Sequence, residues 1–124
     1  MAHIDNSRAK AQARWKLKTI CELVAAFNAA REKSDPIENI HQHALSTNVR
    51  GLAIPGFPFE AVEYEIQLCW GATAVRITGA LRGHEPNTAR LEYRDRFAPW
   101  QELKTSDAHK ETMLEYARFF YFGS

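Results

Sequence analysis

The sequence has few cysteines, no long apolar run and almost no net charge. Its two cysteines, Cys21 and Cys69, fall in segments of different predicted type and are too few for a disulfide framework, so we interpret both as reduced thiols. No segment approaches the roughly 18 apolar residues of a membrane span. Residues 1–14 are polar and lack the apolar core of a signal peptide. These absences predict a soluble, cytoplasmic protein.

The sequence also lacks the motifs of common enzymes and metal sites. It contains no G-x-S-x-G, P-loop, H-E-x-x-H or G-x-G-x-x-G pattern. His41 and His43 have a spacing that allows chelation, but a structural zinc site usually takes four ligands, and neither cysteine has a motif spacing to these histidines. We therefore expect no catalytic residue, no cofactor and no bound metal.

What the sequence does contain is the balance of one globular domain, residues 1–124, with 45% hydrophobic and 25% charged residues. The formal net charge of +1 indicates no class of partner, but the charge is unevenly placed. Residues 1–33 hold seven basic against three acidic residues, and the other 91 hold nine against twelve. The N-terminal segment therefore has its own basic character.

Two segments have the periodicity of amphipathic helices. In residues 5–33, apolar side chains recur at spacings of three and four from Ala13 to Phe27, and Pro36 follows the end of the segment. In residues 106–122, Ser106 offers an N-cap oxygen before a second apolar face. The sequence thus predicts one helix near each end of the chain.

The second helix would end in four consecutive aromatic residues, Phe119 to Phe122. Because each helical step turns about 100°, these rings would point to all sides of the helix. The helical pattern places Phe120 and Tyr121 in the core. It leaves Phe119 and Phe122 at the flanks, as contacts with a second chain or with residues 37–60.

Alternation of apolar and polar residues predicts a sheet over residues 62–97, with strands at 62–70, 73–81 and 89–97. A Gly71-Ala72 turn would join the first two strands in a hairpin. A two-residue loop would pair Leu68 with Val75 and Ile66 with Ile77. All four apolar side chains would then lie on the same face of the sheet.

The third strand would turn Leu91, Tyr93 and Phe97 toward the core. The same alternation places Asp95 among them, where a carboxylate is stable only with a partner. An arginine partner, a bulge that turns Asp95 outward, or an acid–base role are the alternatives.

Residues 37–60 have the weakest pattern. Residues 37–45 are compatible with a short helix, and residues 52–59, which contain two prolines and a glycine, with a loop or an irregular edge. The fold predicted from all segments is α+β. A long N-terminal helix and a C-terminal helix pack on one apolar face of a three-stranded antiparallel meander.

Two basic features are candidates for partner binding. One is the flank of the first helix, where Trp15 lies away from the apolar stripe beside Arg14 and Lys18. The other is a set of arginines on the polar face of the sheet, which shares that face with several glutamates. Exposed tryptophan is enriched in interface hot spots, although residues 37–60 would be an alternative cover for Trp15. The candidate partner-binding residues are Arg14, Trp15, Lys18, Arg76, Arg94 and Arg96.

Several segments resemble a family of small proteins encoded by tailed phages and prophages. They are ALSTNVR at 44–50, AVRITG at 74–79 and ARLEY at 89–93. The most specific piece is Pro99-Trp100 followed by LEYARFFYFG at 114–123. The resemblance implies a phage or prophage origin and supplies no active site.

The leading functional expectation is a phage accessory protein that binds a host or phage macromolecule, with inhibition of a host defence such as CRISPR as one possibility. A protein partner is favoured, and self-association as a homodimer is open. The first alternative is a nucleic-acid-binding protein that uses the first helix and the sheet arginines. The second alternative is a small enzyme built around Asp95.

Overall fold

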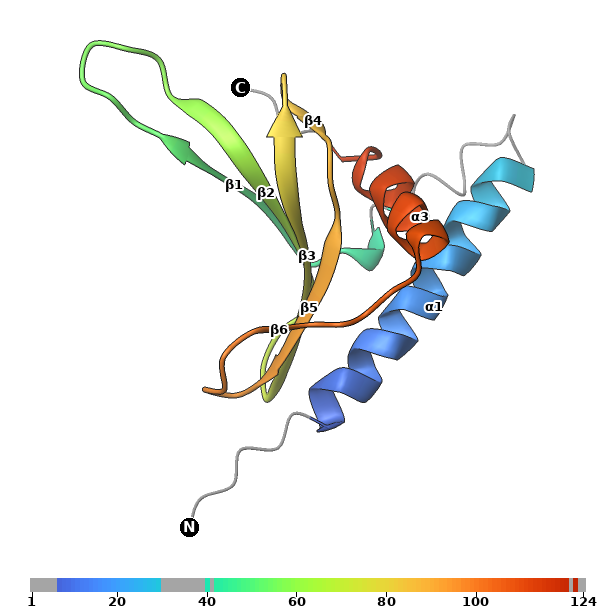
Figure 1. Ribbon diagram of the computed structural model, residues 1–124. Coiled ribbons are helices and arrows are strands. Elements are labelled where there is room, and N and C mark those ends of the chain that lie inside the picture. The colour runs from blue at the N-terminus through green and yellow to red at the C-terminus, as the bar shows by residue number, and fades with distance from the viewer. Residues whose placement is uncertain (1–6, 30–39, 41, 121, 123–124) are drawn as a thin grey trace.

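The polypeptide folds into one antiparallel sheet with two helices on the same side of it. The computed structural model describes residues 7–29, 40, 42–120 and 122. The strand order is β1-β2-β3-β5-β6, and the short β4 pairs antiparallel with the end of β3. Both helices lie on one face of the sheet (Figure 1), which confirms the α+β class. The elements are α1 (Ser7–Ala29), β1 (Ser46–Leu52), β2 (Glu60–Cys69), β3 (Thr73–Arg82), β4 (Glu85–Pro86), β5 (Arg90–Asp95), β6 (Gln101–Glu102) and α3 (Asp107–Ala117).

The core lies between the helices and the inner face of the sheet. The stripe predicted on the first helix is buried, and β2, β3 and β5 supply the opposing side chains at alternate positions. Ser106 caps α3 as predicted, with its Oγ accepting a hydrogen bond of 3.1 Å from the backbone N–H of His109. The buried sheet residues include Tyr64, Ile66, Leu68, Val75, Ile77, Leu91 and Tyr93.

The central hairpin follows the predicted register along most of its length. Ile66 pairs with Ile77 as expected, but the register then shifts, so that Cys69 rather than Leu68 lies opposite Val75. The β2–β3 connection has three residues between the strands instead of two, and Gly71 adopts a positive φ of 129°. The pairing Leu68–Val75 was therefore wrong, although Leu68 remains buried.

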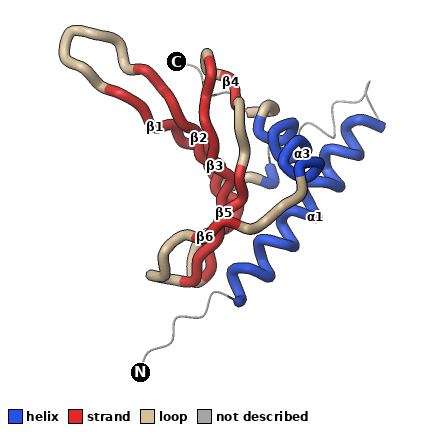
Figure 2. The backbone as a smooth tube through the Cα atoms, in the orientation of Figure 1, coloured by secondary structure: helices blue, strands red, loops and turns tan. Residues whose placement is uncertain are grey.

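The interpretation of residues 37–60 missed β1. All seven residues of this strand are exposed, because it forms the edge of the sheet. An edge strand with both faces in solvent shows no alternation of burial, so the sequence pattern carried no strand signal. β1 and β2 form a hairpin arm that projects beyond the rest of the sheet (Figure 2).

Two local predictions at strand and helix ends were wrong. β5 ends at Asp95, and Arg96 turns the chain with a φ of 42°, so that Phe97 is 97% exposed instead of buried. α3 ends at Ala117, and the next residues form tight turns in which the N–H of Phe119 donates to the carbonyl of Tyr116. Helical periodicity therefore stops before the aromatic run, and Phe122 is buried.

Candidate functional site

A row of alternating arginine and tryptophan side chains crosses the outer face of the sheet, away from the helices. The Arg76 guanidinium lies 3.9 Å from the centroid of the Trp100 ring. The Arg94 guanidinium lies 4.5 Å from the same ring and 5.6 Å from that of Trp70. Each contact is a cation–π interaction, so the four side chains form one connected row.

Arg76 anchors one end of this row. Its Nη1 lies 2.6 Å from Glu65 Oε2 and its Nε lies 2.9 Å from Glu92 Oε1, with all three side chains about 15% exposed. Burial favours a higher pKa for Glu65, but hydrogen bonds from Gln67 and Arg76 and the charge of Arg76 hold the pKa below its usual value. Arg76 is thus occupied by two carboxylates and is not available to a phosphate group.

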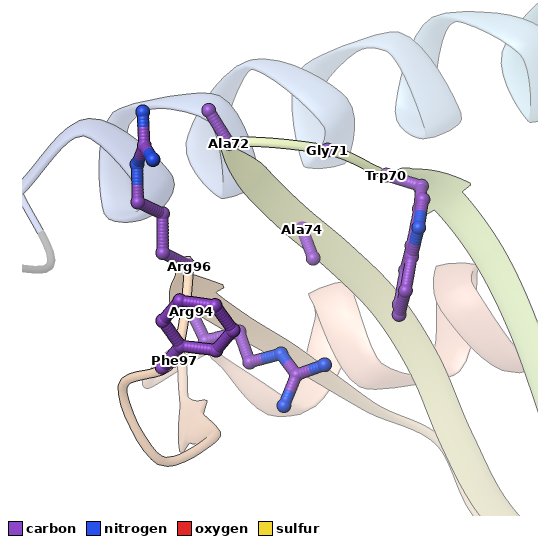
Figure 3. Close-up of a pocket in the computed structure, with 7 residues that line it drawn as sticks. All are labelled: Trp70, Gly71, Ala72, Ala74, Arg94, Arg96 and Phe97. Carbon is purple, nitrogen blue, oxygen red and sulfur yellow. The ribbon is translucent and has the colours of Figure 1, made fainter.

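The other end of the row is open to solvent. Trp70 is 64% exposed and Phe97 is 97% exposed, and a hollow of about 340 Å³ lies between them. Figure 3 shows Trp70 on one side, Phe97 with Arg94 and Arg96 on the other, and Ala74 between them. Within the described part of the chain, no ion pair joins either arginine to a carboxylate.

Two turns build this open end. The first is the β2–β3 connection, which carries Trp70, and the second is the turn after β5, which carries Phe97. The backbone N–H of Arg96 donates a 2.9 Å hydrogen bond to the carbonyl of Ala72, which ties the two turns together. The aromatic side chains therefore project from backbone that is held in place rather than from a free loop.

The N-terminus of α1 lies against the same end of the sheet. The backbone N–H of Ala9 donates a 3.4 Å hydrogen bond to Asp95 Oδ2, and this carboxylate adds a negative charge where the helix dipole is positive. Asp95 therefore contacts the N-terminus of a helix. The alternatives expected from the sequence were an arginine partner, an outward bulge or an acid–base role, but not this contact. It holds the first turn of α1, which includes the exposed Arg8 and Lys10, against the end of β5.

The basic flank of α1 lines a hollow of its own. From Ser7 to Cys21, α1 contains five basic residues and no acidic one. On its flank, a groove of about 550 Å³ runs between α1 and the segment that follows β5. The basic residues lining this groove are Lys10, Arg14, Lys104 and His109.

Trp15 and Lys18 lie apart from this site. Trp15 is 61% exposed, and the Lys18 ammonium lies 5.6 Å from its ring. Two positions from the buried Leu17, Trp15 is on the side of α1 that faces away from the sheet. We define the aromatic–basic end as the separate set Trp70, Arg94, Arg96 and Phe97, together with Arg8 and Lys10.

Sequence reasoning selected Arg94 and Arg96 but missed the two aromatic side chains beside them. Trp70 was assigned to a half-buried strand and Phe97 to the core. The exposure of these two rings could have been inferred from their place beside a turn. Each aromatic residue is adjacent to a turn residue, Gly71 or Arg96, that adopts a positive φ. A large apolar side chain at such a turn has little protein around it to cover it.

The described residues bring together no set of three His, Cys, Asp or Glu side chains that could hold a metal ion. His41 lies outside these residues. Burial, followed by the charge of Glu22, raises the pKa of the Cys21 thiol, which disfavours a reactive thiolate. Neither described helix is long and apolar enough to cross a membrane.

Comparison with protein-family models, curated proteins and solved structures finds no significant match. The resemblance to phage proteins therefore stays a prediction.

A half-buried histidine makes the stability of the fold depend on pH. His43 Nδ1 lies 2.8 Å from the hydroxyl of Tyr116 in the core. Burial, with the nearby charge of Lys16, lowers the pKa of His43 from 6.5 to about 4. The unfolded chain then takes up a proton that the folded chain resists. The contribution to stability is therefore complete above pH 6.5 and is lost as the pH falls toward 4.

We expect the free energy of unfolding to fall by about 1–2 kcal/mol from this histidine across that window, because partial exposure screens the full linkage effect. Urea denaturation at a series of pH values measures it. His43→Gln should flatten the dependence, since an amide keeps a polar group beside Tyr116 without titrating. His109→Gln, at an exposed position of α3, is the control and should leave it unchanged. Equal slopes for His43→Gln and the original chain would contradict the prediction.

Proposed function

We propose that this protein binds single-stranded nucleic acid at its aromatic–basic end. The observation that carries the proposal is the pair of exposed rings, Trp70 and Phe97, on either side of a hollow. The hollow also contains two arginines that no ion pair joins to a carboxylate of the described residues. Bases stack on exposed aromatic rings, and arginine pairs with the phosphates between them. Arg8 and Lys10 extend the positive charge beyond the hollow.

Single strands fit this surface better than duplexes. Stacking on Trp70 requires a free base face, and a duplex hides both faces of each base within its own stack. The hollow, about 340 Å³, is at the small end of the range for ligand sites, so it suits one flat group rather than a whole duplex groove. The expected preference is for unpaired strands of DNA or RNA with little sequence specificity.

The buried half of the arginine–tryptophan row supports binding by positioning Arg94. Its guanidinium lies within cation–π distance of both Trp70 and Trp100, and Trp100 in turn stacks on the anchored Arg76. A long side chain that is already ordered loses less conformational entropy when it binds a phosphate. Arg76 thus acts through Trp100 and Arg94 rather than by touching the ligand.

We propose a biological setting from the resemblance to phage proteins. We propose a binding protein, not an enzyme, with an accessory role for a phage or prophage. RNA-guided defence complexes contain both guide RNA and a displaced DNA strand, so a host defence such as CRISPR is a setting in which single-strand binding interferes. The competing interpretation is a protein partner, because tryptophan and arginine are also typical of protein hot spots.

Fluorescence anisotropy tests the proposal. A labelled oligonucleotide of about 15 nucleotides, as DNA and as RNA, is titrated with the protein at low salt and compared with the matching duplex. Trp70→Ala and Phe97→Ala should each weaken binding by roughly 5- to 150-fold, since stacking contributes about 1–3 kcal/mol per base. About four phosphate contacts predict a slope near −3 for log K against log salt. Arg96→Gln should reduce that slope by about 0.7.

Arg82→Gln is the matched control. Arg82 is an exposed arginine at the far end of β3 from the hollow, so its loss should leave both affinity and salt slope nearly unchanged. Three results would each overturn the proposal: no binding at low salt, tighter binding to the duplex, or equal effects of Trp70→Ala and Arg82→Gln. An absence of binding at low salt would favour a protein partner instead.

A further inference from the structure

The β1–β2 arm carries most of the exposed apolar surface in the described part of the chain. Of ten large hydrophobic side chains exposed there, seven lie on the arm or at its base, and residues 51–59 contain no charged residue. Phe57 and Phe59, 72% and 51% exposed, together present roughly 250 Å². The seven residues are Leu45, Val49, Leu52, Ile54, Phe57, Phe59 and Val62.

The arm also presents an open hydrogen-bonding edge. β1 is the first strand of the sheet order and pairs only with β2, so the other edge of its backbone has no strand beside it among the described residues. Proteins usually protect such an edge with prolines, inward charges or a covering segment. β1 has no proline and a single charged residue, Arg50. The natural occupant of this edge is another extended strand.

The sequence of β1 and its flanks is self-complementary for antiparallel pairing. With a two-fold axis through Val49, Val49 faces its own copy, Asn48 faces Arg50, and the apolar Leu45 faces Ala53 (each pair of numbers adds to 98). Apolar positions therefore meet at the centre of β1 and just beyond its two ends. Leu45, at 62% exposed, lies at the base of one arm, where Ala53 of the partner subunit would face it.

Charge supports the same alignment. Arg50 lies 3.8 Å from Glu63 within one chain, and the amide of Asn48 lies 3.5 Å from Glu65. In this alignment each Arg50 faces the partner's Asn48, which lies beside an acidic side chain, and the two Arg50 residues do not face each other. The alignment thus avoids like charges at directly opposed positions, which destabilise strand pairs.

We propose that two copies of the chain associate by antiparallel pairing of their β1 strands about a two-fold axis at Val49, which forms one continuous sheet across the dimer. A two-fold interface uses the same patch twice, so a self-complementary strand satisfies it without any other partner. The pairing does not depend on the proposed nucleic-acid site, because the two surfaces lie at opposite ends of β2. This strand begins at the tip of the arm, and Trp70 follows its last residue. The contact is small, and we expect a dissociation constant in the micromolar range.

Sedimentation velocity over a range of protein concentrations, without nucleic acid, tests the proposal. The original chain should change from monomer to dimer as its concentration passes through the micromolar range. Val49→Lys places two ammonium groups opposite each other at the axis and should raise the dissociation constant about tenfold or more. Val62→Lys is the matched control, because Val62 is on the same arm with the same 37% exposure but on β2. It should leave the dimer intact.

A cross-link gives a second measurement that does not depend on affinity. Directly opposed residues of antiparallel strands have Cα atoms about 4.5–5.5 Å apart, within the range of a disulfide. Val49→Cys should therefore form an intermolecular disulfide under mild oxidation, and Val62→Cys should not. A monomer at all concentrations, equal loss of the dimer in both lysine variants, or cross-linking through position 62 instead of 49 would overturn the proposal.

Discussion

Deletion of residues 119–124 is expected to abolish cooperative folding. The deletion removes Phe122, which is 4% exposed and whose ring centroid lies 5.0 Å from that of Tyr64. It also removes Phe119, which packs edge-to-face on Phe27 at 4.6 Å, and Phe120, which contacts Tyr116 at 5.4 Å. These rings join α1, α3 and the sheet, so the tail is a shared part of the core.

The magnitude of this effect is comparable to the whole stability of the domain. Removal of one buried phenylalanine costs about 3–5 kcal/mol, and a domain of this size unfolds with about 5–15 kcal/mol. Urea denaturation followed by circular dichroism should show no cooperative transition for the deletion. Phe122→Ala should retain a transition at a lower midpoint, and deletion of residues 123–124 alone is the control. A cooperative transition of the deletion variant at the full-length midpoint would show that the tail does not belong to the core.

The parts of the fold that sequence predicted correctly depend on local periodicity. The apolar stripe of α1 and the pairing of Ile66 with Ile77 follow from spacings of 3.6 and 2 residues, which persist over many residues and tolerate single exceptions. The wrong predictions occur where one residue ends a pattern. Arg96 turns the chain before Phe97, and α3 ends before Phe122, so an extrapolated period placed each ring on the wrong side.

The candidate site was only partly predictable because it depends on contacts between distant segments. Arginines on the polar face of the sheet could be selected from alternation alone. Arg76 is neutralised because Glu65 and Glu92 lie on the two adjacent strands, whereas no carboxylate among the described residues forms an ion pair with Arg94. The contact between Ala9 and Asp95 spans 86 residues of sequence, and no local pattern predicts it.

Replacement of Gly79 by alanine is expected to destabilise the fold by about 3–5 kcal/mol. A Cβ atom on Gly79 would lie 1.9 Å from the carbonyl oxygen of Thr88 and 2.8 Å from Cε1 of Tyr64. The backbone at Thr88 must therefore move away. The same carbonyl accepts a 2.6 Å hydrogen bond from the Tyr64 hydroxyl, whose pKa is raised by burial. The substitution thus adds overpacking and breaks a buried hydrogen bond together.

A double-mutant cycle separates the two contributions. Tyr64→Phe in the original chain should lower the free energy of unfolding by about 1–2 kcal/mol, because it leaves the Thr88 carbonyl without its donor. In the Gly79→Ala background the same change should have little further effect, since the hydrogen bond is already broken. Gly83→Ala is the control for backbone strain alone: its φ is 59° and no atom lies within 4 Å of the added Cβ, so it should cost only about 1–2 kcal/mol. Additive effects of the Gly79 and Tyr64 substitutions in urea denaturation would show that the carbonyl of Thr88 does not couple them.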